Sequence, residues 1–314
     1  MNAAPAPAAQ DPAQAGANLR AMVFVVVGMG AFVINDTLMK ATSSELPLGQ
    51  IITLRGLMSC CIMAPIVILN YGLMSVVRAY SRPLFVRNVA ELGAVFFFLT
   101  ALFQLPMVNV SAVLQAVPLT ITAAAAIFLR EPVGWRRWTA SAVGLLGVLL
   151  IIQPGTTGFS VYYLAALSTV LCVACRDLAT RFIARSAPSL SITLITAMVV
   201  TVFGAALGLA EDWKVPSTNA LLRMAGASVF VLIGYYSLIE AMRTAEISAV
   251  APFRYSVVLW AMLLGFLVFG EVPDLATITG SVVVIGAGLY TLHRERVAHR
   301  RSVSARRDVS VSSR

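Results

Sequence analysis

Charged side chains interrupt long apolar stretches of this sequence at Asp36, Lys40, Arg55, Glu91, Asp177, Arg181, Glu240 and Arg254. A charge far from water is unfavourable unless it pairs with an opposite charge, exchanges a proton or binds a charged solute. These residues are therefore the first candidates for chemistry, and each has a structural alternative.

Two pairs of these candidates are related by a shift along the chain. Asp36 and Lys40 are four residues apart, and Asp177 and Arg181 repeat that spacing 141 positions later. Residues at this spacing share one face of a helix. Each pair either neutralises itself near a helix end or offers both charges to a solute, and the sequence leaves both interpretations open.

Arg55 and Glu91 lie in two different apolar stretches and have two possible roles. One is an ion pair that locks two helices together. The other is a site at which Glu91 binds a proton or the amine of a solute, since a permanent lock would oppose movement between helices.

Arg254 is the most informative of the charged candidates. Its guanidinium is always ionised and presents a flat fork that suits carboxylate or phosphate groups. Pro252, two residues earlier, removes a backbone donor, as in the broken helices that line binding sites. Tyr255 and Trp260 add surface for stacking. The alternative is an internal salt bridge from Arg254 to Glu240.

Two further polar residues complete the candidate set. Gln115, with Pro118 close behind it, occupies the corresponding neighbourhood of the first half of the chain, and Tyr236 lies in a later apolar stretch. The sequence contains no H-E-x-x-H, G-x-S-x-G, Walker or G-x-G-x-x-G motif. We therefore expect neither an enzyme nor a bound metal or cofactor.

The elements that must position these side chains are membrane-spanning helices. Hydrophobic residues make up 59% of the 314 and charged residues 12%, and the mean hydropathy is +0.86, whereas a soluble domain carries about a quarter charged residues. Roughly 20 apolar residues cross a bilayer. Ten such spans are predicted, at 21–40, 49–70, 83–104, 107–129, 136–153, 161–183, 189–210, 221–243, 246–269 and 274–293.

The ten spans fall into two similar halves. The tripeptide at 111–113 returns at 248–250, and Glu131 returns as Glu271 in a second turn of the same kind. Because each half has an odd number of spans, the halves enter the membrane in opposite senses, which is the architecture of alternating access. The predicted divisions are a disordered tail at 1–19, repeats at 20–155 and 156–294, and a basic cytoplasmic tail at 295–314.

Lysine and arginine predict the orientation of the chain. With the N-terminus in the cytoplasm, the cytoplasmic segments hold 18 of the 23 Lys and Arg residues, in agreement with the positive-inside rule. Both termini are then cytoplasmic, and the membrane is the inner one. This bias, with attraction to anionic lipid head groups, explains the net charge of +9 without a nucleic-acid partner.

The two halves resemble a known domain. Each contains an apolar stretch, a glutamate turn (FLREPVGW and VFGEVPDL) and a glycine-bearing last helix (GLLGVLL and GSVVVIGAGLY), an arrangement similar to the EamA domain of the drug/metabolite transporter superfamily. The resemblance covers 20–294 and implies two inverted five-helix repeats around a central cavity. NDTLMK, CRDLATR and APFRYSVVLW are similar to a branch that includes S-adenosylmethionine and riboflavin transporters.

The resemblance implies secondary active transport by alternating access across the inner membrane. The expected substrate is a small polar or zwitterionic metabolite that is amino-acid-like, S-adenosylmethionine-like or riboflavin-like. The other expected partners are the lipid bilayer and either protons or an exchanged metabolite. The alternative is a membrane sensor or scaffold that does not transport.

Overall fold

The computed structural model describes residues 12–128, 134–156, 159–183, 188–244, 251–291 and 293, and these residues form helices and short connections without a β-strand. Eight of the described helices are long and apolar enough to cross a membrane, and two shorter apolar helices lie at Trp138–Ile152 and Leu275–Thr291. The prediction of an all-α membrane protein with ten apolar helices is confirmed.

The helices of the first half follow the predicted spans, apart from an earlier start of the first helix, one extra short helix and a fourth span that is divided into two helices. They are α1 Pro12–Thr42, α2 Leu48–Tyr71, α3 Leu73–Ala79, α4 Arg82–Gln104, α5 Met107–Leu114, α6 Val117–Phe128 and α7 Trp135–Ile152. Because α1 begins at Pro12, it starts within the segment predicted as a tail. The short helix α3 lies between the second and third spans, and α5 and α6 together form the fourth.

The second half repeats this order. Its elements are α8 Tyr162–Thr180, α9 Ser189–Gly208, α10 Thr218–Thr244, the 3-10 segment η1 Ala251–Tyr255 and α12 Ser256–Phe269, followed by the last helix, Leu275–Thr291. The tail predicted at 295–314 lies outside the described residues, as does Glu131.

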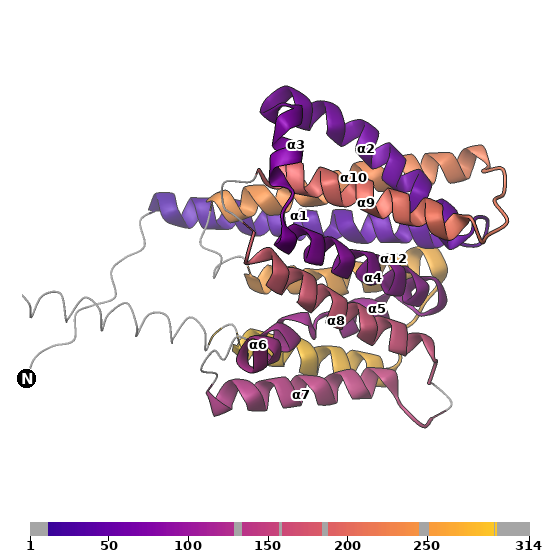
Figure 1. The fold of residues 1–314 in the computed structure, drawn as a ribbon. Coiled ribbons are helices and arrows are strands. Elements are labelled where there is room, and N and C mark those ends of the chain that lie inside the picture. The colour runs from indigo at the N-terminus through magenta and orange to yellow at the C-terminus, as the bar shows by residue number, and fades with distance from the viewer. Residues whose placement is uncertain are drawn as a thin grey trace, which may run out of the picture.

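Helices of the two halves pack together in equivalent pairs, and equivalent helices run in opposite directions. α1 packs along α10, the equivalent helices α8 and α4 pack together, and α2 pairs with its own counterpart α9 (Figure 1). α1 runs toward the end of the bundle where Lys40 bonds the carbonyl oxygen of Leu105. α8 begins at that end, where Tyr163 accepts a hydrogen bond from Asn109. The repeats are therefore inverted, and we name the two ends of the bundle the Lys40 end and the Arg176 end.

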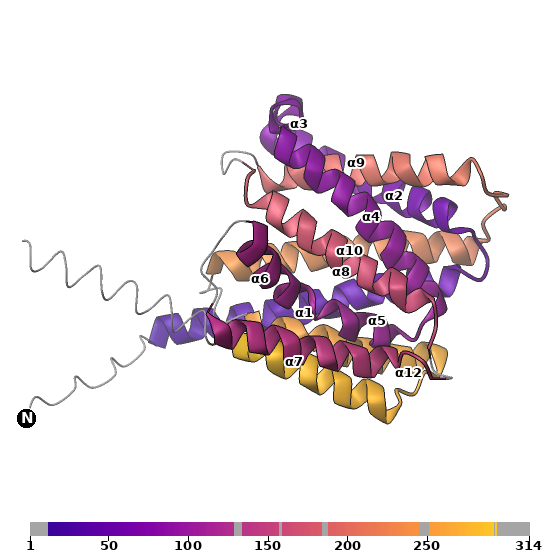
Figure 2. The same cartoon turned by 60° about the horizontal axis from the view of Figure 1, so that its bottom comes forward.

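Glycines bring the final helices of the two repeats together. α7 and the last helix lie side by side (Figure 2), and a Cβ atom on Gly280 would lie 2.6 Å from the carbonyl oxygen of Gly147. Any larger residue would therefore push the helices apart, which agrees with a packing role for these glycines.

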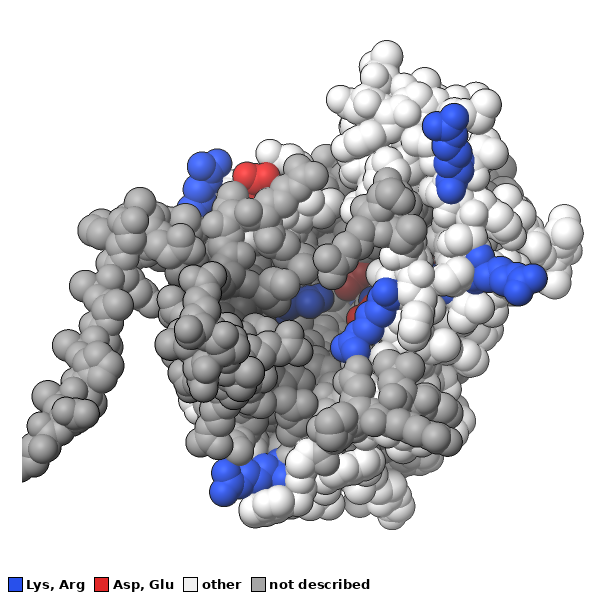
Figure 3. Space-filling model, turned by 60° about the vertical axis from the view of Figure 1, so that its left-hand side comes forward, with Lys and Arg blue, Asp and Glu red and all other residues white. Residues whose placement is uncertain are grey.

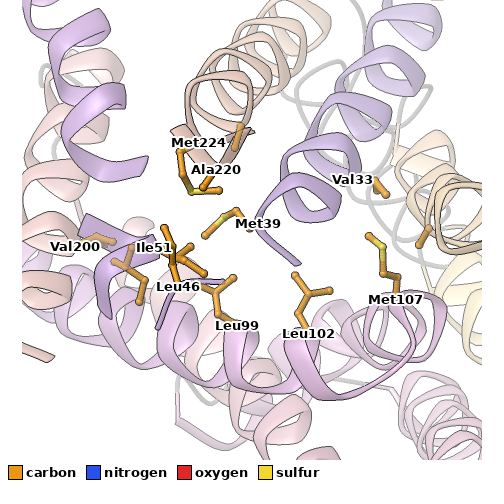
Figure 4. Packing of buried hydrophobic residues seen from close by; sticks show 13 residues of the cluster. Val33, Met39, Leu46, Ile51, Leu99, Leu102, Met107, Val200, Ala220 and Met224 are labelled. Atoms are coloured by element: carbon orange, nitrogen blue, oxygen red, sulfur yellow. The ribbon is translucent and has the colours of Figure 1, made fainter. Parts of the chain in front are cut away.

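The apolar core joins both repeats in the half of the bundle nearer the Lys40 end. Met39 of α1, Leu99 of α4 and Met224 of α10 converge there (Figure 4). The side chains of Met39 and Met224 are 1% and 0% exposed. This close packing holds helices of both repeats together near the Lys40 end.

Candidate functional site

Each repeat contains one helix that is broken at an equivalent place. α5 ends at Leu114, and α6 begins at Val117 with Pro118 in its first turn. In the second repeat, η1 carries Pro252 and precedes α12. Proline cannot donate the helical hydrogen bond, and broken backbone at membrane depth is tolerated where it is buried in protein or lines a water-filled cavity.

Arg176 on α8 is the centre of a charged cluster. Its Nη1 lies 3.1 Å from Oε2 of Glu91 on α4, and its Nε lies 2.8 Å from Oδ1 of Asp177. The Glu91 side chain is only 12% exposed. One guanidinium therefore holds two carboxylates by charge-assisted hydrogen bonds and links helices from both repeats.

Arg254 and Tyr235 extend this cluster. The exposed side chain of Arg254 on η1 is close enough to Asp177 and Arg176 for electrostatic interaction. Tyr235 on α10 lies within electrostatic range of both Arg176 and Arg55. Tyr235 is therefore within range of both the Arg176 cluster and Arg55 on α2.

Asp36 and Arg55 form the other half of the charged site. Asp36 on α1 accepts a 2.9 Å hydrogen bond from Nδ2 of Asn35 and is close enough to Arg55 on α2 for electrostatic attraction. The backbone of Arg55 is held by Ser228 on α10, whose hydroxyl donates to its carbonyl oxygen over 3.0 Å. The pair therefore lies at the junction of three helices.

The surface is hollowed at the Arg176 end. Figure 3 looks onto that face, and basic and acidic side chains meet near the centre of the hollow. Charged groups at membrane depth are accommodated where they face a water-filled cavity or one another.

An ion pair closes the opposite end. Nζ of Lys40 lies 2.6 Å from Oε1 of Glu271, with the side chains 11% and 16% exposed. The ammonium also donates to the carbonyl oxygen of Leu105, and Oε2 of Glu271 accepts a 2.7 Å hydrogen bond from the amide of Met107. These contacts tie α1, the connection between α4 and α5, and the end of α12 into one unit.

Connecting segments at the Lys40 end are joined across the repeats as well. Glu211, after α9, accepts a 2.9 Å hydrogen bond from the amide of Gly49 in the first turn of α2. Glu45 accepts a 2.8 Å hydrogen bond from the amide of Ser217, and the hydrogen bonds from Ser217 lower the pKa of the Glu45 carboxyl. The Lys40 end is therefore linked by polar contacts in addition to the apolar core.

Three predicted site residues are engaged in helix packing. Trp260 donates a 3.1 Å hydrogen bond to the carbonyl oxygen of Val26 on α1. The hydroxyl of Tyr255 lies against Gly288 of the last helix. The amide of Gln115 donates to a carbonyl oxygen of its own helix.

The remaining predicted residues lie on α8 and α10. Tyr236 is 65% exposed on α10, Glu240 is half-buried on the same helix, and the exposed Arg181 follows the last residue of α8. The structure thus brings Asp36, Arg55, Glu91, Asp177 and Arg254 toward one site. It places Lys40 at the closed end.

The charge pairs differ from those suggested by spacing. Glu91 pairs with Arg176 rather than with Arg55. Lys40 pairs with Glu271 rather than with Asp36, four residues away on its own helix.

The sequence does not single out Arg176, because the predicted orientation places it among the cytoplasmic charges. A signal was present: position 176 is the repeat equivalent of Asn35, directly before the repeated aspartate.

The chain belongs to the EamA-like transporter family, whose profile matches residues 19–153 and 160–292. It is thus a multi-pass membrane transporter of small molecules, built from two copies of one domain. The expected resemblance to the EamA domain is confirmed.

Curated relatives are transporters of several metabolites. The chain is 26% identical over 269 residues to an S-adenosylmethionine uptake transporter of Rickettsia prowazekii, covering 84% of this chain and 89% of the relative. It is 25% identical to a riboflavin transporter of Vibrio cholerae, covering 63% and 66%. It is also 25% identical to the pseudopaline exporter CntI of Pseudomonas aeruginosa, covering 85% and 93%.

A solved crystal structure has a similar fold. It matches with a TM-score of 0.58 and 20% sequence identity, and the match covers 88% of this chain and 97% of that one. The likeness extends over almost all of that protein and concerns the fold alone.

Proposed function

We propose that this transporter moves a small polar or zwitterionic metabolite across the inner membrane by alternating access. One observation carries the proposal: two sets of opposite charges, Asp36 with Arg55 and the Arg176 cluster with Arg254, lie at membrane depth between the repeats. A solute that carries both a positive and a negative group can satisfy such a site without leaving an uncompensated charge.

The proposed conformation is inward-facing. Under the positive-inside rule the Arg176 end is cytoplasmic and both termini lie on that side. The cavity then opens to the cytoplasm while Lys40, Glu271 and the apolar core close the outer end. Transport requires a second conformation in which the inner end closes and the outer end opens, and inverted repeats supply two such arrangements of one fold.

The substrate class is narrowed by the relatives. Proteins similar to this chain are named for S-adenosylmethionine, riboflavin and pseudopaline, so the proposed substrate is a polar metabolite of comparable kind. Uptake and export use the same site, and the gradient sets the direction. The driving force is a proton gradient or exchange for a second metabolite.

Counterflow in proteoliposomes tests this function. Vesicles with purified full-length protein are loaded with unlabelled S-adenosylmethionine, riboflavin or an amino-acid mixture, and the entry of the same labelled compound is followed with and without a pH gradient. We expect counterflow of one compound class and its loss in Arg254→Ala. Binding without counterflow for every compound would instead indicate a sensor.

A further inference from the structure

Three buried polar atoms on α1 and α2 have no hydrogen-bond partner. They are Oδ1 of Asn35, Nε of Arg55 and Oγ of Ser59. Asn35 is 4% exposed and Ser59 is 7% exposed, and Ser59 follows Arg55 by one helical turn. An unpaired buried polar group costs roughly 1–3 kcal/mol. All three belong to Arg55 or to residues within one helical turn of Arg55 or Asp36, so one bound molecule can supply the missing partners.

The repeat gives an independent reason to expect a cation beside Asp36. Asn35 and Asp36 are equivalent to Arg176 and Asp177, 141 positions later. In the second repeat the arginine bonds its neighbouring aspartate over 2.8 Å. In the first repeat Asn35 bonds Asp36 over 2.9 Å with a neutral amide. The first repeat therefore keeps the aspartate but has a neutral amide at the position where the second repeat has an arginine.

We propose that Asn35, Asp36, Arg55 and Ser59 bind the α-amino-acid head group of the substrate. Arg55 and Ser59 donate to the carboxylate, whose oxygens only accept. Asn35 Oδ1 and the Asp36 carboxylate accept from the ammonium, which only donates. This inference rests on the proposed function and deepens it, because it selects amino-acid-bearing metabolites over flavins, which carry neither group.

The Arg176 cluster does not compete for this role. Glu91 and Asp177 already share one guanidinium, whereas Arg55 Nε and Asn35 Oδ1 have no protein partner. The head group therefore lies on the α1–α2 side of the site. The rest of the substrate extends toward Tyr235, which interacts electrostatically with both sides.

Equilibrium binding to the purified full-length protein tests the head-group site. The probes are S-adenosylmethionine, its decarboxylated analogue, L-methionine and riboflavin. We expect the parent protein to bind S-adenosylmethionine at least tenfold more tightly than the decarboxylated analogue, and Arg55→Gln to abolish that difference. Ser59→Ala, a small change that preserves folding, is expected to weaken the preference several-fold.

Two further variants sharpen the test. Asn35→Arg copies the second repeat into the first and supplies the missing cation, so it should prevent binding of the amino-acid probes. Tyr255→Phe is the matched control, because it removes another unpartnered buried hydroxyl that lies against Gly288, outside the proposed site. It should leave every affinity unchanged.

Three outcomes would overturn the inference. They are equal binding of the decarboxylated analogue by the parent, binding of riboflavin but of neither amino-acid probe, and an unchanged preference in both Arg55→Gln and Ser59→Ala. If riboflavin counterflow proceeds in any of these cases, the transporter function stands and only the head-group site fails. If counterflow is absent for every compound, the proposed function fails with it.

Discussion

Removing the charge of Glu271 should open the Lys40 end. In Glu271→Gln the amide oxygen can still accept from Met107, and Lys40 keeps the carbonyl oxygen of Leu105, but the 2.6 Å ion pair is lost. The pair bridges α1 and the end of α12. Loss of the pair therefore raises the free energy of the conformation that is closed at the Lys40 end, relative to the conformation that is open at that end.

The size of this effect follows from the contacts that remain. A hydrogen bond to a charged group contributes about 1.5–3 kcal/mol, and the low exposure of both side chains, 11% and 16%, limits screening by water. Loss of about 2 kcal/mol changes the equilibrium between the two conformations about thirty-fold. The fraction of molecules open at the Lys40 end should rise by that factor.

Cysteine accessibility measures the change. The four free cysteines are replaced, and Thr37→Cys serves as the reporter because Thr37 is 6% exposed and contacts Met107 one turn from Lys40. A membrane-impermeant maleimide is added from the side of the Lys40 end. The labelling rate should rise about thirty-fold in Glu271→Gln, because Thr37→Cys reacts only in molecules that are open at the Lys40 end and their fraction rises by that factor. Lys40→Met should raise the rate by a similar factor.

Asp274→Asn is the control for this experiment. It changes another carboxylate at the same end, where Asp274 accepts a hydrogen bond from Gln153, but it leaves the Lys40 pair intact and should not alter labelling. Equal labelling rates in the parent, Glu271→Gln and Lys40→Met would refute the reasoning.

Three further predictions follow from other contacts. Asp274 accepts a 2.8 Å hydrogen bond from the amide of Thr277, so Asp274→Ala should cost about 1 kcal/mol of thermal stability. The hydrogen bonds from Thr277 lower the pKa of Asp274. The stabilisation by Asp274 is therefore present above the ordinary carboxyl pKa and is lost as pH falls through the lowered pKa. An Asp274→Ala variant that is still less stable than the parent in acid would contradict this. Gly288→Ala should lower the melting temperature because its Cβ would overlap the Tyr255 hydroxyl. Adding Tyr255→Phe to this variant should restore part of the lost melting temperature. No recovery would show that the clash lies elsewhere. Arg176→Lys should slow counterflow by at least about tenfold, because a lysine cannot hold two carboxylates in the same fork, and an unchanged rate would remove Arg176 from the site.

Much of the fold could be predicted because each span carries its own signal. The apolar length of α2 or α9 is local information, and so is the proline that accompanies each helix break, Pro118 in α6 and Pro252 in η1. The equivalence of Asp36 and Asp177 was also visible as a fixed shift. These features needed no knowledge of which helices touch.

The charge pairs could not be predicted in the same way. Lys40 has an aspartate one turn away on its own helix, yet its partner is Glu271, 231 positions later. Glu91 meets Arg176 only because α4 packs along α8. Such contacts depend on tertiary packing, which brings together residues that are far apart in the sequence. The unpartnered atoms of Asn35 and Ser59 became visible only when every neighbour was placed.

Access to the site from both sides of the membrane tests alternating access most directly. Tyr235→Cys in the cysteine-free protein places one thiol beside the charged cluster, where the native side chain is 38% exposed. Without substrate, an impermeant maleimide should react rapidly from the Arg176 end and slowly from the Lys40 end. During counterflow, reaction from the Lys40 end should accelerate. Counterflow that proceeds while the thiol reacts from one end alone would contradict a single site that alternates between the two sides.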